Sequence, residues 1–237
     1  MNHARAARQP PEVSEPVGLT VTYPYTSVRS IMLTASTFVV LALTACYLLF
    51  LRWYGGRARP LSAAEIDAYL AELAARPQSE HSHGALDQIR ALVRDDDGRE
   101  FVMQNLVRYR SRALYPDGYR YDDDPRAADR RYGKAILWPL LRHGNLMLFI
   151  ARRSGVFVEP AGADAWHYVA MVRYRSRRDF LKFALTIERD EITVHKWAAI
   201  EKTHIFPVKP LVSLIFVRGA VAVLLIAVGS LTLALLP

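Results

Sequence analysis

An arginine-rich stretch of six residues occurs twice in this chain, and it contains the side chains best suited to chemistry. Val107–Arg112 and Val172–Arg177 are identical letter for letter. Alternation along a strand places two arginines of each copy on one face, namely Arg108 and Arg110 in the first, and Arg173 and Arg175 in the second. If the two strands are neighbours, four guanidinium groups gather at one edge of a sheet and could bind a carboxylate or a phosphate. The alternative is pairing with acidic side chains, of which the sequence offers Asp122–Asp124, Asp179 and Glu201.

His195 is the first candidate for a catalytic base, with Tyr109 or Arg108 as its helper. Such a base needs a pKa near the working pH and a substrate within reach. The competing interpretation is a histidine that makes a structural hydrogen bond. His143 is expected at a helix end, where a cation is favoured by the helix dipole. The H-x-H sequence of residues 81–83 does not by itself indicate a metal site.

Several familiar catalytic and cofactor motifs are absent from the sequence. It has no phosphate-binding glycine loop, no G-x-S-x-G, no C-x-x-C and no haem-attachment motif. The acidic runs Asp95–Asp97 and Asp122–Asp124 lack the spacing of a calcium loop and are typical of turns. We therefore predict no cofactor and no metal site.

The elements that position these residues follow from local patterns. Ser62–Glu65 is a capping box that opens a helix, and residues 85–93 have the apolar spacing of a second short helix. Beyond them the pattern predicts four strands and two helices in the order β-α-β-β-α-β, with strands at 101–109, 146–151, 166–173 and 196–206 and helices at 126–143 and from Ser176 onward.

That order predicts an α+β fold of the ferredoxin-like type, a four-stranded antiparallel sheet with both helices on one face. In this fold the first and third strands are central and adjacent, and the two halves are related by a pseudo-twofold. The repeated stretch supports the assignment, because each copy ends an odd-numbered strand and leads toward a helix.

Several further stretches accompany the repeat: residues 105–110, Tyr115–Gly118, 132–135, 172–180 and 195–203. Together they resemble the DUF1330-like group of dimeric α/β-barrel proteins over about residues 100–207. The resemblance implies a ferredoxin-like domain that forms a homodimer through its sheet. It transfers no catalytic residue, and it does not reach the apolar runs described next.

Two long apolar runs flank this region. Ile31–Leu51 contains no charged residue, and Leu211–Pro237 is interrupted only by Arg218. A hydrocarbon core of about 30 Å requires roughly 20 apolar residues in a helix, so both runs are long enough to cross it. Arg218 is expected near the membrane surface, with a paired charge inside the membrane as the alternative.

The orientation follows from basic residues beside the two runs. Five lie on the side of the central region and three on the other, namely Arg52, Arg57, Arg59, Lys202 and Lys209 against Arg5, Arg8 and Arg29. Basic residues favour the cytoplasmic side. We therefore expect a multi-pass protein of the inner (plasma) membrane whose central domain is cytoplasmic, with the lipid bilayer as its first partner.

The expected organisation has five parts: a disordered tail (1–30), a transmembrane helix (31–52), a linker with two short helices (53–99), the ferredoxin-like domain (100–207) and a second transmembrane helix (211–236). The net charge of +8 is a mild bias with mixed signs, which argues against nucleic acid as a partner. The only cysteine, Cys46, lies in the first apolar run, so no intrachain disulfide forms.

Three functions remain open at this point. The first is a binding, assembly or accessory role at the membrane, with a membrane-protein partner. The second is a small membrane-bound enzyme, oxygenase-like or isomerase-like, acting on a lipophilic or anionic molecule between sheet and helices. A cavity lined by Tyr109, His195 and Arg108 would favour the enzyme. The third is RNA binding on an open sheet, which requires exposed Tyr109 and Tyr174.

Overall fold

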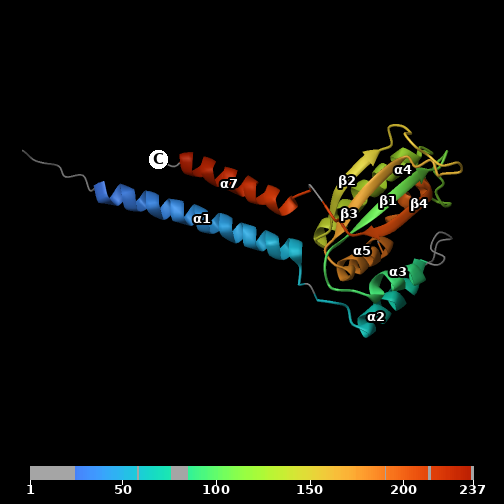
Figure 1. Ribbon diagram of the computed structural model, residues 1–237, viewed down its shortest axis with the longest axis horizontal. Coiled ribbons are helices and arrows are strands. Elements are labelled where there is room, and N and C mark those ends of the chain that lie inside the picture. The colour runs from blue at the N-terminus through green and yellow to red at the C-terminus, as the bar shows by residue number, and fades with distance from the viewer. Residues whose placement is uncertain (1–24, 58, 76–84, 190, 213–214, 236–237) are drawn as a thin grey trace, which may run out of the picture.

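A computed structural model describes residues 25–57, 59–75, 85–189, 191–212 and 215–235. These residues form seven helices and four strands, in a mixed α+β body from which two long helices extend (Figure 1). Residues 1–24, most of the tail that we expected to be disordered, lie outside the described residues, as do residues 78–84 with their histidines. The expected tail includes residues 25–30, and these belong to the first helix instead.

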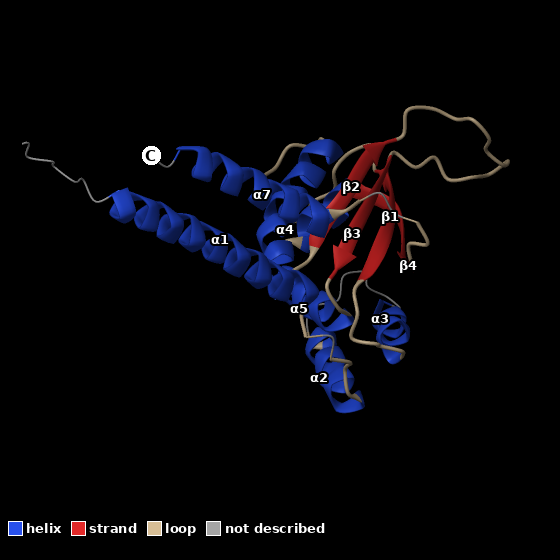
Figure 2. Cartoon of the chain, turned by 60° about the vertical axis from the view of Figure 1, so that its left-hand side comes forward, coloured by secondary structure: helices blue, strands red, loops and turns tan. Residues whose placement is uncertain are grey.

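Helix α1 (Tyr25–Gly55) contains the first apolar run, and α7 (Val217–Leu235) contains most of the second. They lie side by side and leave the same end of the body (Figures 1 and 2). Gly229 of α7 packs against Leu43 of α1 so closely that a Cβ atom there would lie 2.7 Å from Leu43 Cδ1. Ala35–Gly55 and Val217–Leu235 are long and apolar enough to cross a membrane, and very few of their residues are buried.

The next two helices, α2 (Ala63–Ala74) and α3 (Ala85–Arg94), pack against residues 181–185 of the chain. Ser62 caps α2 as predicted, because its hydroxyl accepts from Glu65 N and the Glu65 carboxylate accepts from Ser62 N. Leu73 of α2 and Val93 of α3 are buried against Leu181 and Leu185. These leading helices are thus part of the body.

The sheet contains β1 (Phe101–Tyr109), β2 (Leu146–Arg152), β3 (Tyr168–Tyr174) and β4 (Ile200–Val208), in the spatial order β2-β3-β1-β4 with every pairing antiparallel. The register of the central pair runs from Phe101 opposite Tyr174 to Val107 opposite Tyr168. The first and third strands are therefore central and adjacent, as predicted.

Helices α4 (Pro125–Arg142) and α5 (Arg177–Arg189) cover one face of this sheet. Their buried Ile136, Leu140 and Phe183 pack on Met103 and Val172. The opposite face is contacted at one end by Tyr54 of α1, which packs on Arg173, and Leu106 and Met171 lie half-buried on it. The main core therefore lies between the sheet and these two helices, while α5 also packs on the smaller buried cluster that it forms with α2 and α3.

The last strand differs from the prediction at its beginning. Residues 196–199 were expected in a strand, but they belong to a short helix, α6 (Thr193–Ala199). Its Ala198 and Ala199 are buried against Ala128 of α4, an approach that small side chains permit. The strand begins only at Ile200, and His195 consequently lies on a helix.

Candidate functional site

The four arginines of the repeat do not gather; they form two pairs at opposite ends of the sheet. Arg108 and Arg110 lie where β1 ends, close to the beginning of β3, whereas Arg173 and Arg175 lie where β3 ends, beside the beginning of β1. The expectation of a single cluster was wrong because corresponding ends of antiparallel neighbours point in opposite directions.

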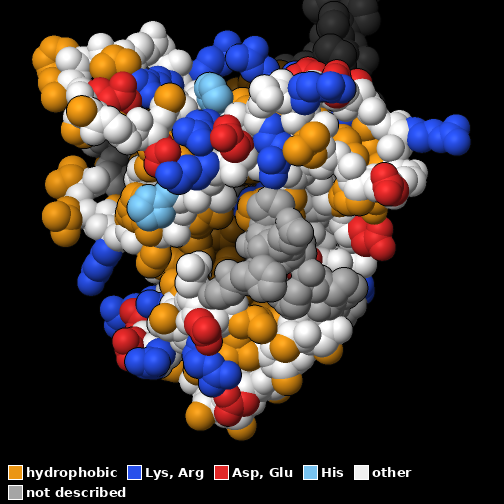
Figure 3. All heavy atoms as spheres, turned by 90° about the vertical axis from the view of Figure 1, so that its right-hand side faces the viewer, with side chains coloured by type: hydrophobic (Ala, Val, Ile, Leu, Met, Phe, Trp, Pro, Cys, Tyr) orange, Lys and Arg blue, Asp and Glu red, His pale blue; other side chains and the backbone are white. Residues whose placement is uncertain are grey.

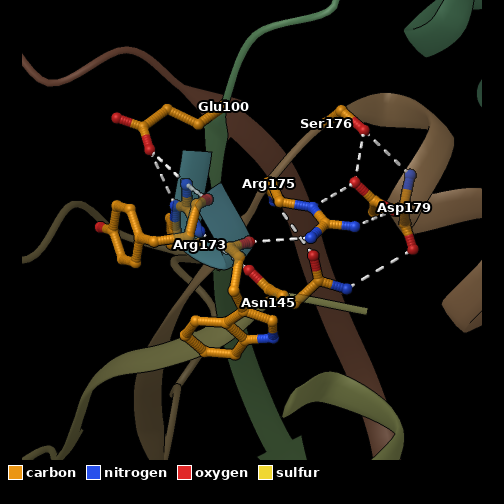
Figure 4. A network of polar contacts seen from close by, with 9 residues as sticks. Glu100, Asn145, Arg173, Arg175, Ser176 and Asp179 are labelled. Carbon is orange, nitrogen blue, oxygen red and sulfur yellow. Dashed lines mark hydrogen bonds and ion pairs between the residues drawn. The ribbon is translucent and has the colours of Figure 1, made fainter. Parts of the chain in front are cut away.

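Arg173 joins the body to the end of α1. Its side chain is buried, and it donates to Tyr54 O at 2.7 Å, Gly144 O at 2.8 Å and Glu100 Oε2 at 2.9 Å (Figure 4). The guanidinium carbon also lies 3.7 Å from the centre of the Tyr54 ring. All of its donor groups point at these partners, so Arg173 is a structural link.

Arg175 makes a second link to the same helix end. It holds Asp179 through two hydrogen bonds of 2.7 and 2.8 Å, and it donates to Trp53 O at 2.8 Å. Burial alone would raise the pKa of Asp179, but the hydrogen bonds from Arg175 and Ser176 outweigh it and hold that pKa below its ordinary value. The positive charges of Arg173 and Arg175 at the carboxyl end of α1 also interact favourably with the dipole of that helix.

The other pair lies at the far end of the sheet. Arg108 pairs with Glu201 at 2.9 Å and Asp164 at 3.5 Å, and its buried Nε has no partner among the described residues. Arg110 donates from Nε to Trp197 O at 3.3 Å. Arg108 thus pairs with nearby acids, among them Glu201, which the sequence offered as such a partner.

A cavity of about 790 Å³ opens between α4 and strands β1, β2 and β3, at the end of the sheet away from α1 and α7. Its apolar wall comes from Ile136, Met147, Ile150 and Ala170. Its polar lining consists of aromatic, acidic and basic side chains, among them Tyr109, Asp129, His167, Tyr168, Arg126 and Arg152. An apolar pocket with a few convergent polar groups is the usual form of a small-molecule site.

Asp129 is the centre of the polar lining. Its carboxylate accepts hydrogen bonds from the phenols of Tyr109 at 2.8 Å and Tyr168 at 3.1 Å. Burial raises the pKa of Asp129 above its ordinary value, although both hydrogen bonds act in the opposite direction. Burial likewise raises the pKa of both phenols, so they remain protonated donors at neutral pH.

Lys196 of α6 belongs to the same electrostatic neighbourhood. Burial lowers the pKa of Lys196 to about 8, and the charges of Glu188 and Asp129 only partly oppose this shift. An amine with this pKa exchanges protons close to neutral pH. The region around the cavity therefore holds both a carboxyl group that is easier to protonate than usual and an amine that is easier to deprotonate.

His195 lies outside this cavity. Its Nδ1 is 3.0 Å from the hydroxyl of Tyr115, and the edge of its ring meets Tyr121. Burial, helped by the positive charge of Arg131, lowers the pKa of His195. The structure therefore separates the three residues proposed as catalytic: Tyr109 lines the cavity, whereas His195 and Arg108 do not.

Asp129 and Tyr168 were missed at the sequence level, although a signal for Asp129 was present. Asp129 precedes Tyr132 by three residues and Ile136 by seven, so it lies on the apolar stripe of α4. A carboxylate on a buried stripe indicates either a partner or a site. Within the described residues, no three His, Cys, Asp or Glu side chains gather in a way that could hold a metal ion.

Comparison with known proteins gives structural neighbours only. No family model and no curated protein matches the chain. A crystal structure of RPA0582, a protein of unknown function from Rhodopseudomonas palustris, is 25% identical, with a TM-score of 0.47 over 58% of this chain and 97% of that one. Methylated RPA0582 is 26% identical, with a TM-score of 0.47 over 57% of this chain and 94% of that one.

Proposed function

We propose that this chain is a membrane-anchored protein whose central domain binds a small organic acid in the cavity beside Asp129. The observation that carries the proposal is the Tyr109–Asp129–Tyr168 group facing a cavity that is otherwise largely apolar. An organic acid with an apolar body would cover Ile136 and Met147. Its charged group would meet Arg126 and Arg152, whose charges already act on Tyr109.

The membrane part of the proposal is supported by α1 and α7. Large apolar side chains such as Phe38, Leu41, Leu224 and Ile226 are mostly exposed along both helices, and exposed apolar surface of this extent favours lipid. A cytoplasmic domain in the inner membrane follows from the basic residues beside the two runs. After extraction of membranes with alkaline carbonate, we expect the chain in the pellet; a chain in the supernatant would contradict anchoring.

The domain in this proposal is ferredoxin-like and related to the DUF1330-like group. The strand order β2-β3-β1-β4, with the central pair formed by the first and third strands, supports this assignment. The sheet face opposite α4 and α5 bears Leu106, Met171, Phe149 and Phe206. We propose that a second copy covers this face in a homodimer, while a membrane-protein partner would contact α1 and α7.

Catalysis is a second candidate function, and one observation favours it. A carboxyl group whose pKa is raised by burial, next to phenols that stay protonated, is suited to transfer of a proton to or from a bound substrate. In this alternative Asp129 is the acid or base, and Tyr109 and Tyr168 hold it in position.

RNA binding has little support. Tyr174 is only 7% exposed and packs in the core, so the open tyrosine pair that base stacking requires is not formed. Acidic and basic side chains are also interspersed on the end of the body that faces away from α1 and α7 (Figure 3). Such a surface offers no continuous basic stripe to a phosphate backbone.

The ligand proposal is tested with full-length protein in lipid nanodiscs. Trp166 lines the cavity, so we expect its fluorescence to respond to a medium-chain alkyl carboxylate more strongly than to the corresponding alcohol. Arg152→Gln should weaken that preference, whereas Arg142→Gln, which is outside the cavity, should not. Equal responses to acid and alcohol, or no saturable response, would refute a site for organic acids.

A further inference from the structure

A second cavity lies where α1 meets the body, and its lining is strongly basic. It has a volume of about 910 Å³. Six of its lining side chains are cationic, namely Arg52, Arg57, Arg59, Arg175, Arg178 and Lys182. Asp179 is the single acidic side chain among the lining residues.

Half of these cations are compensated by acids of the body. Arg175 binds Asp179 through two hydrogen bonds, while Glu65 serves both Arg59 and Arg178. The carboxylates available at the cavity are thereby occupied, and the hydrogen bonds from Arg178 and from Ser62 N hold the pKa of Glu65 far below its ordinary value.

The remaining three cations form no ion pair in the described part of the chain, although the charge of Lys182 acts on Asp179. Arg52 belongs to the last turn of α1, Arg57 follows the helix, and Lys182 projects from α5, with all three side chains exposed. Three like charges around one cavity repel each other. An anion with several oxygens would relieve that repulsion, and a phosphate accepts forked hydrogen bonds from arginine.

The place of the cavity selects the source of that anion. Its wall includes Leu49 and Trp53 from the last turns of α1, so apolar and aromatic surface continues directly into the basic lining. Tryptophan is typical of the membrane interface, and basic residues next to a span attract anionic lipids. A lipid would place its chains along Leu49 and its phosphate between Arg52, Arg57 and Lys182.

We infer that this junction cavity binds the headgroup phosphate of an anionic phospholipid. The inference rests on the membrane anchoring proposed above. A free phosphate offers the same chemistry to the three cations but no acyl chains to Leu49 and Trp53, so it should bind more weakly. The lipid would lie between the anchor and the body, beside the hydrogen bonds of Arg175 to Trp53 and Asp179 (Figure 4).

The test uses full-length protein in detergent, titrated with phosphatidylglycerol, phosphatidylcholine or inorganic phosphate and followed by native mass spectrometry. We expect one tightly retained phosphatidylglycerol per chain, with weaker retention of phosphatidylcholine and no competition from inorganic phosphate at equal concentration. At a contribution typical of basic side chains at an anionic surface, Arg52→Gln, Arg57→Gln and Lys182→Gln together should weaken phosphatidylglycerol binding about a hundredfold.

The control variant removes three exposed basic side chains that lie away from both cavities, Arg94→Gln, Arg120→Gln and Lys134→Gln. It should retain the lipid as the unchanged protein does. Equal loss in both variants, or equal retention of the two lipids, would overturn the inference, and displacement by inorganic phosphate would identify a free-phosphate site instead. If the triple variant does not fold, Lys182→Gln alone provides the same comparison with Lys134→Gln.

Failure of the anchoring proposal is recognised separately. A chain that does not float with phosphatidylcholine vesicles refutes anchoring, whatever its affinity for phosphatidylglycerol. A chain that floats with these vesicles but shows no preference for the anionic lipid refutes only the junction site.

Discussion

Replacing Arg173 by methionine should detach the end of α1 from the body. Methionine fills much of the volume of the arginine side chain but donates no hydrogen bonds. Two carbonyl oxygens, Tyr54 O and Gly144 O, would lose a buried donor, and the ring of Tyr54 would lose the cation above it. Glu100 remains half-exposed and stays near Arg218, so it contributes little to the loss.

The magnitude follows from these contacts. Each unsatisfied buried acceptor costs about 1–3 kcal/mol, and breaking a buried charged network costs about 3–5 kcal/mol. We therefore expect the substitution to lower the free energy of unfolding by about 4 kcal/mol. For a body of this size, that change corresponds to a Tm lowered by about 10 °C. The assay is a thermal melt of the full chain in detergent, followed by intrinsic tryptophan fluorescence.

The control variant is Arg112→Met. Arg112 belongs to the first copy of the repeat and corresponds to Arg177 in the second copy. Arg112 is 74% exposed and pairs with Asp123, which is 63% exposed. An exposed pair of this kind contributes about 0–1 kcal/mol. If Arg173→Met lowered the Tm no more than Arg112→Met does, the assignment of Arg173 as the link between anchor and body would be wrong.

Three further outcomes are expected. Because burial raises the folded-state pKa of Asp129, the unchanged protein should gain stability relative to Asp129→Asn as the pH falls through that pKa, and a Tm difference independent of pH would contradict this. Arg131→Gln should raise the pKa of His195, measured by NMR titration of the ring protons, since burial and the charge of Arg131 both lower it; an unchanged midpoint would exclude that charge as a cause. Gly144→Ala should lower the Tm, because its φ is +71° and a Cβ would lie 2.9 Å from Arg175, whereas Gly133→Ala in α4 meets nothing within 4 Å and should raise stability by about 0.5–1 kcal/mol.

The sequence predicted the secondary structure well wherever a local signal was strong. The bounds of β1 were predicted to the residue, because nine residues rich in β-formers follow a turn at Asp95–Gly98. The beginning of α2 was predicted from its capping box. The short helix α6 was not, because a single apolar turn with Trp197 and two alanines has no periodicity that separates helix from strand.

The candidate site was predicted less well, and the repeat shows why. Both copies end a strand at their tyrosine, Tyr109 or Tyr174, but their identical sequences carried no information on the direction of the strands. Because β1 and β3 pair in an antiparallel manner, Arg173 lies beside the end of α1, whereas Arg108 lies at the opposite end of the sheet. The carboxylate of Asp129 was overlooked because its two partners, Tyr109 and Tyr168, are close only after the sheet has formed.

Both connections between the body and the long helices leave from the same end, where β4 leads to α7 and the carbonyls of α1 are held by Arg173 and Arg175. Two chain connections and the hydrogen bonds of Arg173 and Arg175 to α1 join the body to the long helices. The body therefore has little freedom to tilt relative to these helices. In the membrane-anchored arrangement that we propose, the mouth beside Asp129 is then separated from the anchored end of the body by about the length of the nine residues of β1, roughly 27 Å. Molecules would enter it from the aqueous phase, while lipids would reach only the opposite end.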